Sequence, residues 1–333
     1  MDKYLELLKN DQGTGLVIGD IILDEYHNGI SDYSSNERSS VFRKQSTLYF
    51  PGNAANIANG IASLNQNVIL CGIIGNDFGG QKLIELLHDR VDHDSVIIEP
   101  YRDTSVKTRI ESEHLKLRID KGYDYRINEH TEAQIVSNVS SLMEILDYVL
   151  LSDWGEGTLS AKLTKAVISL AVANRIPVFV DPRGKDPEKY RGATCVTPNL
   201  DEFNDLTEFR FQSLNEAIPF LRPFIRKYDI ESIILKDGHR GSVWANHESF
   251  RFCAPFSAYC ECDIGAGDSL ICSYAVLRSK KIPDSHAFLM SNLAAAITIS
   301  KPHTYCVTLS DLMRYYDEYA NKLNVDWLAE VMP

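Results

Sequence analysis

The feature that most constrains the fold is a repeated alternation between short apolar runs and longer segments of helical periodicity. The apolar runs are rich in Val, Ile and Leu and lie at residues 16–20, 68–74, 147–152, 177–181 and 232–236. Runs of this kind are typical of strands that are buried on both faces of a parallel sheet. They predict a sheet whose strands are joined by longer crossover segments.

The crossover segments have the periodicity of helices. Candidates lie at residues 53–64, 80–89, 132–146, 160–174 and 214–228, and in the first of them apolar residues from Ala54 to Leu64 form one stripe. Alternating strands and helices predict a doubly wound α/β fold. In such folds ligands bind at the carboxyl ends of the strands, so candidate site residues are sought there.

Two polar stretches, at about 26–50 and 101–125, interrupt this rhythm. Both show strand-like alternation without the long apolar run of a core strand. We interpret them as insertions that form a small exposed sheet, which would cover a site or form a dimer surface. Long surface loops are an equally weighted alternative. No repeat or linker marks a second folded unit, so residues 1–333 are expected to form one domain.

The charge and cysteine content exclude several classes of function. Lys and Arg number 34 and Asp and Glu 46, a net charge of −12, which argues against nucleic-acid or anionic-membrane partners. The seven cysteines are scattered without a Cys-x-x-Cys pair, and Cys260 and Cys262 are expected to be free thiols on one face of a strand. The charged, amphipathic start and the lack of a membrane-length apolar run favour a cytoplasmic protein.

The run Gly265-Ala266-Gly267-Asp268 precedes a helix-compatible segment and is the most informative motif. Small residues at a helix start let backbone N–H groups approach an anion, and the helix dipole adds to the attraction. Asp268 could then accept the proton of a hydroxyl that attacks a phosphate. A tight turn capped by Asp is the alternative for this motif alone. The chain contains no G-x-x-x-x-G-K-[ST] sequence, so it is not a P-loop enzyme.

Polar side chains suited to sugar hydroxyls follow two other elements. Gly52, Asn53 and Asn56 lie at a predicted helix start, where the two amides could face one pocket, although N-capping by Asn53 is the alternative. Asp20 and Asp24 follow the first strand and could bind hydroxyls, although Asp20 could instead stabilise a turn.

Two further clusters follow later strands. Asn199 and Glu202 have a spacing that suits a Mg²⁺ site bridged by water, because magnesium keeps much of its hydration shell. The run from Lys236 to Gly241 is glycine-rich, so it is either a loop on the nucleotide side or a hairpin.

Taken in order, these motifs resemble the ribokinase family of carbohydrate kinases, also called the phosphofructokinase-B family. The likeness covers about residues 13–313 and includes residues 72–79 in addition to the clusters above. Within the family the sequence is most similar to bacterial D-glycero-D-manno-heptose 7-phosphate kinases, in Leu117 to Asp120 and in Asp181-Pro182-Arg183-Gly184. The resemblance implies a three-layer, mostly parallel sheet with a small β-sheet lid. It also leads us to expect the kinase part alone, without the nucleotidyltransferase part that many relatives carry.

The resemblance also implies roles for individual residues. Asp268 would be the catalytic base, with Gly265, Ala266 and Gly267 as the anion hole. Asn199 and Glu202 would order Mg²⁺ through water. ATP would contact Asn199, Lys236, Gly238 and Gly241. The sugar phosphate would contact Asp24, Gly52, Asn53, Asn56, Arg109, Lys116 and Arg118, although a solvated charged face is the alternative for the last three.

The implied reaction is phosphorylation of a heptose 7-phosphate by ATP at the anomeric hydroxyl, in a cytoplasmic enzyme that could dimerise through its lid. Relatives carry Asp and Thr where this chain has Cys262 and Ile264, and Lys where it has Glu156. These departures keep two alternatives open. One is another sugar or nucleoside kinase of the family, and the other is a sugar-phosphate-binding homologue with weak catalysis.

Overall fold

The computed structural model describes residues 3–34, 39–122, 126–256, 260–320 and 328–329. Its strands are Thr14–Gly19 (β1), Ile21–Ser34 (β2), Ser39–Asn53 (β3), Asn67–Gly75 (β4), Val91–Asp92 (β5), Val96–Glu99 (β6), Ser105–Ser112 (β7), Leu115–Lys121 (β8), Tyr148–Ser152 (β9), Val178–Asp181 (β10), Cys195–Val196 (β11), Ser232–Lys236 (β12), Ser242–Asn246 (β13), Phe250–Cys253 (β14) and Leu328–Ala329 (β15).

The α-helices are Lys3–Asn10 (α1), Ala54–Ser63 (α2), Phe78–Glu85 (α3), Glu129–Leu142 (α4), Ala161–Ala173 (α5), Leu200–Thr207 (α6), Leu214–Lys227 (α7), Ala266–Ser279 (α8), Asp284–Ile299 (α9) and Leu309–Ala320 (α10). Single turns of 3₁₀ helix lie at Met143–Ile145, Pro187–Tyr190 and Gly238–Arg240.

The main sheet is mostly parallel and has the strand order β15-β14-β13-β12-β11-β10-β9-β1-β4-β5, with β6 also paired to β4. Strands from β12 back to β5 run parallel, whereas β12, β13, β14 and β15 pair antiparallel at one edge. The central strands are buried along their length because helices cover both faces. The predicted doubly wound α/β class is confirmed.

Two apolar cores lie on opposite faces of this sheet. One is formed with α1, α2, α8, α9 and α10, and the other with α4, α5, α6 and α7. The three-layer arrangement follows from strands such as β1, whose successive side chains contribute alternately to the two cores. Among the residues described, no helix is both long and apolar enough to span a bilayer.

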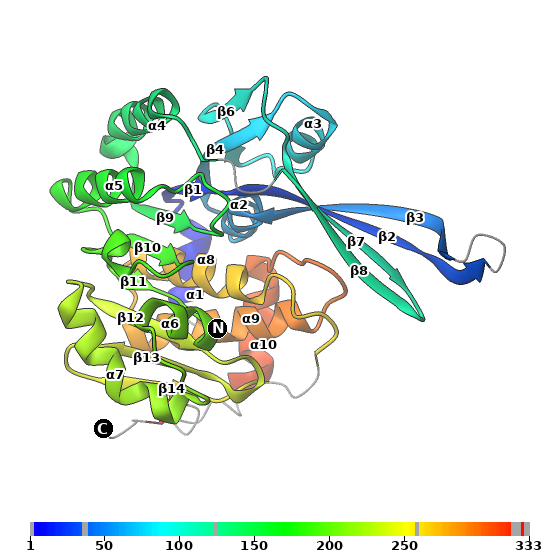
Figure 1. Cartoon of the computed structure of the whole chain (residues 1–333). Coiled ribbons are helices and arrows are strands. Elements are labelled where there is room, and N and C mark those ends of the chain that lie inside the picture. Colours follow the sequence, from blue (N-terminus) through cyan, green and yellow to red (C-terminus); the bar gives the residue numbers. More distant parts are fainter. Residues whose placement is uncertain (1–2, 35–38, 123–125, 257–259, 321–327, 330–333) are drawn as a thin grey trace.

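A second, four-stranded sheet has the order β3-β2-β7-β8, and we call it the lid sheet. Figure 1 shows its two hairpins reaching away from the α/β core. Only Asp20 separates β1 of the main sheet from β2 of the lid sheet. The stretches at 26–50 and 101–125 therefore supply most of the lid strands, with residues 101–104 and 113–114 outside them, and the surface-loop alternative is wrong. Residues 35–38 and 123–125 lie outside the described ranges.

One local expectation is also wrong. Cys260 and Cys262 are free thiols, but their segment is not a strand. A segment this short carries too few periodic residues to predict a strand from the sequence.

Candidate active site

The helix α8 brings the Gly-Ala-Gly-Asp motif to the centre of the molecule. Gly265 has a φ of 84°, a left-handed conformation that favours glycine, and no side chain caps the helix. Every residue from Ser269 to Leu277 is buried, so the helix is anchored along most of its length. Asp268 lies in the first turn, where the N–H groups of the helix end are directed toward a ligand.

Asp268 and Asn56 meet although 212 positions separate them. Asn56 Nδ2 donates a hydrogen bond to Asp268 Oδ2 at 2.6 Å, and Asn56 is buried. Burial raises the pKa of Asp268 to about 7, although the bond from Asn56 and the charge of Lys236 lower it. A carboxyl group with this pKa changes its protonation state near neutral pH, which suits a general base.

The inner ends of the paired strands β2 and β3 carry further candidate residues near the start of α2. Arg109 of β7 forms an ion pair with Asp24 of β2. A Cβ atom added to Gly52 would lie 2.6 Å from Asp24 Oδ2, so a larger residue at position 52 would displace that carboxylate. Asp24, Gly52 and Arg109 therefore lie together. The charge of Asp24 also raises the pKa of Asp268, so this group lies near the carboxyl group that Asn56 binds.

Asn53 does not cap α2. Its φ of 48° and ψ of −121° lie in a region that favours glycine, and its side chain makes no capping bond. Its Nδ2 atom is buried and has no hydrogen-bond partner among the described residues. The N-cap alternative is wrong, and the amide remains a candidate sugar contact.

Asp20 has a structural role. Its carboxylate accepts hydrogen bonds from the backbone N–H groups of Trp154, Glu156 and Thr158 at 3.0–3.1 Å. It is buried and thereby fixes the loop that follows β9 against the junction of β1 and β2. The turn-stabilising alternative holds for Asp20, whose oxygens are already engaged.

A pocket of about 560 Å³ lies beside the start of α8. It is lined by the predicted nucleotide residues Asn199, Lys236, Gly238 and Gly241, and by Ala266 and Gly267 of the predicted anion hole. The segment from Lys236 to Gly241 is a hairpin between β12 and β13, and it also lines this pocket. The hairpin interpretation is confirmed, and the place on the nucleotide side stays a prediction.

Lys236 lines this pocket, and its charge lowers the pKa of Asp268. Its Nζ is 2.9 Å from Asp181 Oδ1, and a Cβ atom on Gly267 would lie 3.4 Å from the same nitrogen. Burial opposes its charge, but the carboxylates of Asp181 and Glu202 raise the pKa of Lys236. The ammonium group therefore stays protonated beside the start of α8. Asp181 is the last residue of β10 and was missed as a candidate site residue, although its place at a strand end could have indicated it.

Asn199 and Glu202 form a reciprocal capping box at the start of α6. Asn199 Oδ1 accepts from the backbone N–H of Glu202 at 2.8 Å, and Glu202 Oε2 accepts from that of Asn199 at 2.7 Å. The spacing of three that suggested a metal pair is thus used for capping. Burial raises the pKa of Glu202, whose other oxygen lies 3.4 Å from Arg183 Nη1. Within the described ranges, no three His, Cys, Asp or Glu side chains form a metal cluster.

The lid sheet arranges its charged residues on one face. The β2–β7 and β7–β8 registers place Asp24, Lys107, Arg109, Lys116 and Arg118 on the same side. Arg118 pairs with Asp120 at the surface, and Lys116 is exposed, so neither lies at the inner end with Asp24. Sequence reasoning missed Lys107, although it lies two residues before Arg109 and shares its face.

Lys107 is buried and forms an ion pair with Glu156, its Nζ lying 3.2 Å from Glu156 Oε1. The unusual acid at position 156 is thus matched by a lid cation. Of the other departures, Cys262 and Ile264 lie partly exposed just before α8, where Cys262 N donates to the carbonyl of Ile299.

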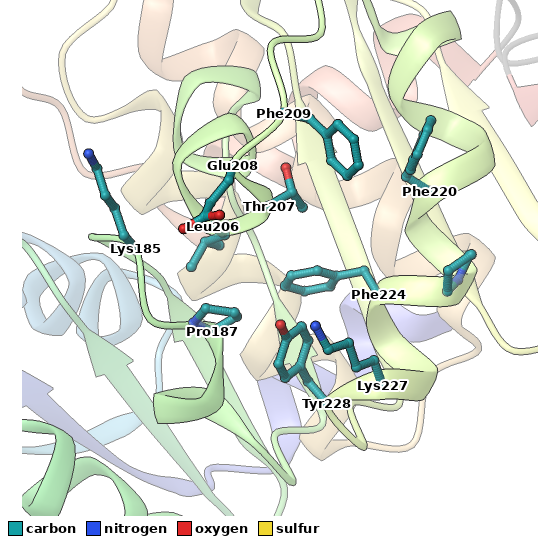
Figure 2. A pocket seen from close by; sticks show the side chains of 11 residues that line it. Lys185, Pro187, Leu206, Thr207, Glu208, Phe209, Phe220, Phe224, Lys227 and Tyr228 are labelled. Atoms are coloured by element: carbon teal, nitrogen blue, oxygen red, sulfur yellow. The ribbon is translucent and has the colours of Figure 1, made fainter.

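A second pocket, of about 390 Å³, lies between the end of α6 and α7. Figure 2 shows its aromatic lining, which includes Phe209, Phe220, Phe224 and Tyr228. None of the predicted site residues lines it, so it is separate from the space around Asp268.

Comparison with known proteins supports a kinase fold. The model of the pfkB family of carbohydrate kinases matches residues 15–309. The chain is 31% identical over 308 residues to the bifunctional protein HldE of Aliarcobacter butzleri and 30% identical over 329 residues to that of Helicobacter pylori. These matches cover 90% and 95% of this chain but 63% and 70% of the relatives, so the chain spans roughly two thirds of their length.

Solved structures of low sequence identity share the fold. An Escherichia coli phosphofructokinase-2 crystallised with substrates and products has a TM-score of 0.77 at 16% identity, over 93% of this chain and 100% of that one. An Arabidopsis thaliana ribokinase complexed with ribose and ATP has a TM-score of 0.74 at 18% identity, over 91% and 98%. The predicted ribokinase-like fold is thereby confirmed.

Proposed function

The chain belongs to the pfkB family of carbohydrate kinases, and from that premise we propose that it transfers the γ-phosphoryl group of ATP to a heptose 7-phosphate. The acceptor would be D-glycero-D-manno-heptose 7-phosphate, phosphorylated at its anomeric hydroxyl. The observation that carries the proposal is the position of Asp268, which is hydrogen-bonded to Asn56, a predicted sugar contact, and follows Ala266 and Gly267, which line a pocket together with Lys236.

The site residues fit an in-line transfer. Asp268 removes the proton of the sugar hydroxyl while the hydroxyl oxygen forms a bond to the γ-phosphorus of ATP. The bond between that phosphorus and the bridging oxygen breaks, and ADP leaves with the oxygen. Lys236 and the N–H groups at the start of α8 would stabilise the negative charge on the phosphoryl oxygens. The proton stays on Asp268 until it leaves with or after the product.

Magnesium would lie on the nucleotide side. The side chains of Asn199 and Glu202 offer oxygen atoms, the ligand type that Mg²⁺ prefers, but the capping box already engages one oxygen of each. They would therefore hold the ion through water. When bound, Mg²⁺ would neutralise charge on the β- and γ-phosphates.

The choice of acceptor rests on two supports. The relatives named HldE are about 30% identical over most of this chain, and the inner face of the lid sheet carries Lys107 and Arg109 next to Asp24. The residues Cys262, Ile264 and Glu156 favour keeping a second candidate, a binding protein with weak catalysis. Another sugar or nucleoside kinase of the family is the third.

A substrate panel separates these candidates. Purified protein is incubated with ATP, Mg²⁺ and each of several sugars, nucleosides and sugar phosphates, and ADP release and thermal shift are measured in parallel. We expect ADP release to be fastest with heptose 7-phosphate. A thermal shift without ADP release would favour the binding protein, and faster release with a different acceptor would overturn the heptose assignment.

Replacing the base tests the mechanism. Asp268→Asn should lower kcat by roughly 10²–10⁴-fold, since the carboxylate that accepts the proton is lost. The exposed Asp89→Asn serves as the matched control and should leave kcat unchanged. Near-native turnover in a folded Asp268→Asn protein would contradict the role of the base.

We also propose that two chains associate through their lid sheets. Leu117 and Ile119 point to the face opposite Asp24, and their exposed fractions are 49% and 50%. Both belong to β8, an edge strand of the lid sheet, and exposed apolar side chains on one face favour association with a second chain through that face.

A further inference from the structure

The ion pair between Lys107 and Glu156 leaves hydrogen-bonding capacity unused inside the protein. Their side chains are 6% and 11% exposed, yet neither Lys107 Nζ nor Glu156 Oε2 makes a well-oriented hydrogen bond to any residue in the described ranges. An ammonium group carries three donors and a carboxylate two acceptor oxygens. Buried polar atoms are nearly always paired, so this donor and this acceptor indicate a group from outside the chain.

The pair lies at the sugar side of the site. Lys107 of β7 is the register neighbour of Asp24 on β2, and their side chains share the inner face of the lid sheet. Glu156 comes from the loop after β9, where its N–H bonds to Asp20. The two charges thus arrive from the lid and from the core, and they meet beside the predicted sugar contacts.

Trp154 limits the space around the pair. Lys107 Nζ lies 4.3 Å from the centre of a Trp154 ring, and Arg183 Cζ lies 4.9 Å from it. A cation over an aromatic ring is stabilised where water is excluded. The ring therefore holds the Lys107 ammonium group in place beside Glu156. The paired charges sum to zero, which suits a neutral partner better than an anion.

We propose that Lys107 and Glu156 together bind one hydroxyl of the acceptor sugar and so help to determine which sugar is accepted. A hydroxyl both accepts and donates, so it would take a hydrogen bond from Lys107 and give one to Glu156 Oε2. This assignment rests on the proposed kinase function and specifies one contact within it. A sugar without that hydroxyl leaves both buried groups unpaired, which a polar site discriminates against strongly.

Kinetics of Lys107→Met and Glu156→Gln test the assignment. With heptose 7-phosphate, each change should raise KM about tenfold or more while kcat changes less, because the contact lies away from the reacting oxygen. In the double variant, KM should rise by less than the product of the two single-variant increases, since both side chains bind the same hydroxyl. The exposed pair Lys82 and Glu85 provides matched controls, Lys82→Met and Glu85→Gln, whose KM should not change.

Monodeoxy analogues of heptose 7-phosphate give a second measurement that needs no variant. Removing one particular hydroxyl should raise KM of the wild-type enzyme about tenfold or more, and the same removal should have little further effect in Glu156→Gln. If the variants only melt at lower temperature and KM stays within about twofold, or if every deoxy analogue is accepted equally, the pair is structural and the proposal is wrong. Absence of turnover with all sugars in the wild type would instead overturn the kinase function itself.

Discussion

At the scale of single residues, the chemistry depends on how the protein tunes Asp268. Its surroundings shift its pKa in opposite directions. Burial raises the pKa of Asp268, whereas the hydrogen bond from Asn56 and the charge of Lys236 lower it. The balance, at about 7, leaves a substantial share of the carboxyl groups ionised at neutral pH. An acid in water would be ionised far below this pH and would be a weaker base.

This balance predicts the pH profile. Only ionised Asp268 can accept a proton, so kcat/KM should rise with pH and level off above an inflection near 7. Asn56→Ala removes the bond that lowers the pKa, so the inflection should move to higher pH. The measurement is kcat/KM from pH 5 to 9 for both proteins. An unchanged inflection in Asn56→Ala would show that another group titrates.

The same pKa predicts a cost in stability. The pKa of Asp268 is raised in the folded protein above the ordinary value of 3.8, so the unfolded chain ionises first and stability declines as pH rises from about 4 to about 7. Asp268→Asn lacks this decline. Its melting temperature should therefore exceed that of the wild type at pH 8, and the gain should shrink toward pH 4. An equal gain at both pH values would assign the effect to packing.

The candidate site residues that could be predicted from sequence are those that lie within recognisable short motifs. Asp268 and Asn56 were predicted because glycine-rich turns before helices have a recognisable composition, although no local pattern shows that the two side chains touch. The spacing of Asn199 and Glu202 was ambiguous, since capping and metal binding use the same residues. Lys107 was missed because a single lysine in a polar strand has no motif, and its burial depends on Glu156 from a distant loop.

At the scale of elements, core strands were easier to predict than lid strands. Residues 232–236 were predicted within their observed bounds because β12 is apolar and buried on both faces. β2 is different, since its first residues pack in the core and its outer half is only partly buried. Its pattern therefore changes along the strand, and the predicted start at about residue 26 missed the true start at Ile21.

The start of α2 shows a local conflict between stability and binding. Asn53 has a positive φ, and any residue with a Cβ atom adopts that conformation at a cost in conformational free energy. Asn53→Gly should raise the free energy of unfolding by about 1 kcal/mol, and Asn53→Ala should not raise it. Urea unfolding of the three proteins measures this. If the amide binds the sugar, the glycine variant will also have a higher KM. Equal stability of the Gly and Ala variants would contradict the strain.

At the scale of the whole molecule, the lid sheet has two different faces. Its inner face is charged and borders the site, whereas its outer face exposes Leu117 and Ile119. Pairing of two chains through the outer face would hold the lid at a fixed distance from the core of each. Acceptor binding and association would then depend on the same strands.

Replacing the exposed apolar pair tests this association. The wild type should have the mass of two 37.5 kDa chains in size-exclusion chromatography with light scattering. Leu117→Asp combined with Ile119→Asp should give a single chain, because four buried carboxylates would repel one another across the interface. Ile145→Asp, at an exposed position distant from the lid in the sequence, is the control. A wild type that is already a single chain would contradict the proposal.

The one-residue junction at Asp20 separates two tasks within one polypeptide. Phosphoryl chemistry is assigned to α8 and the hairpin after β12, whereas the groups that face the acceptor come largely from strands beyond this junction. Changes in the exposed hairpins can therefore alter the acceptor preference of such a chain while the residues assigned to phosphoryl transfer stay unchanged. Charge exchanges such as the acid at position 156 are the form that this divergence takes here.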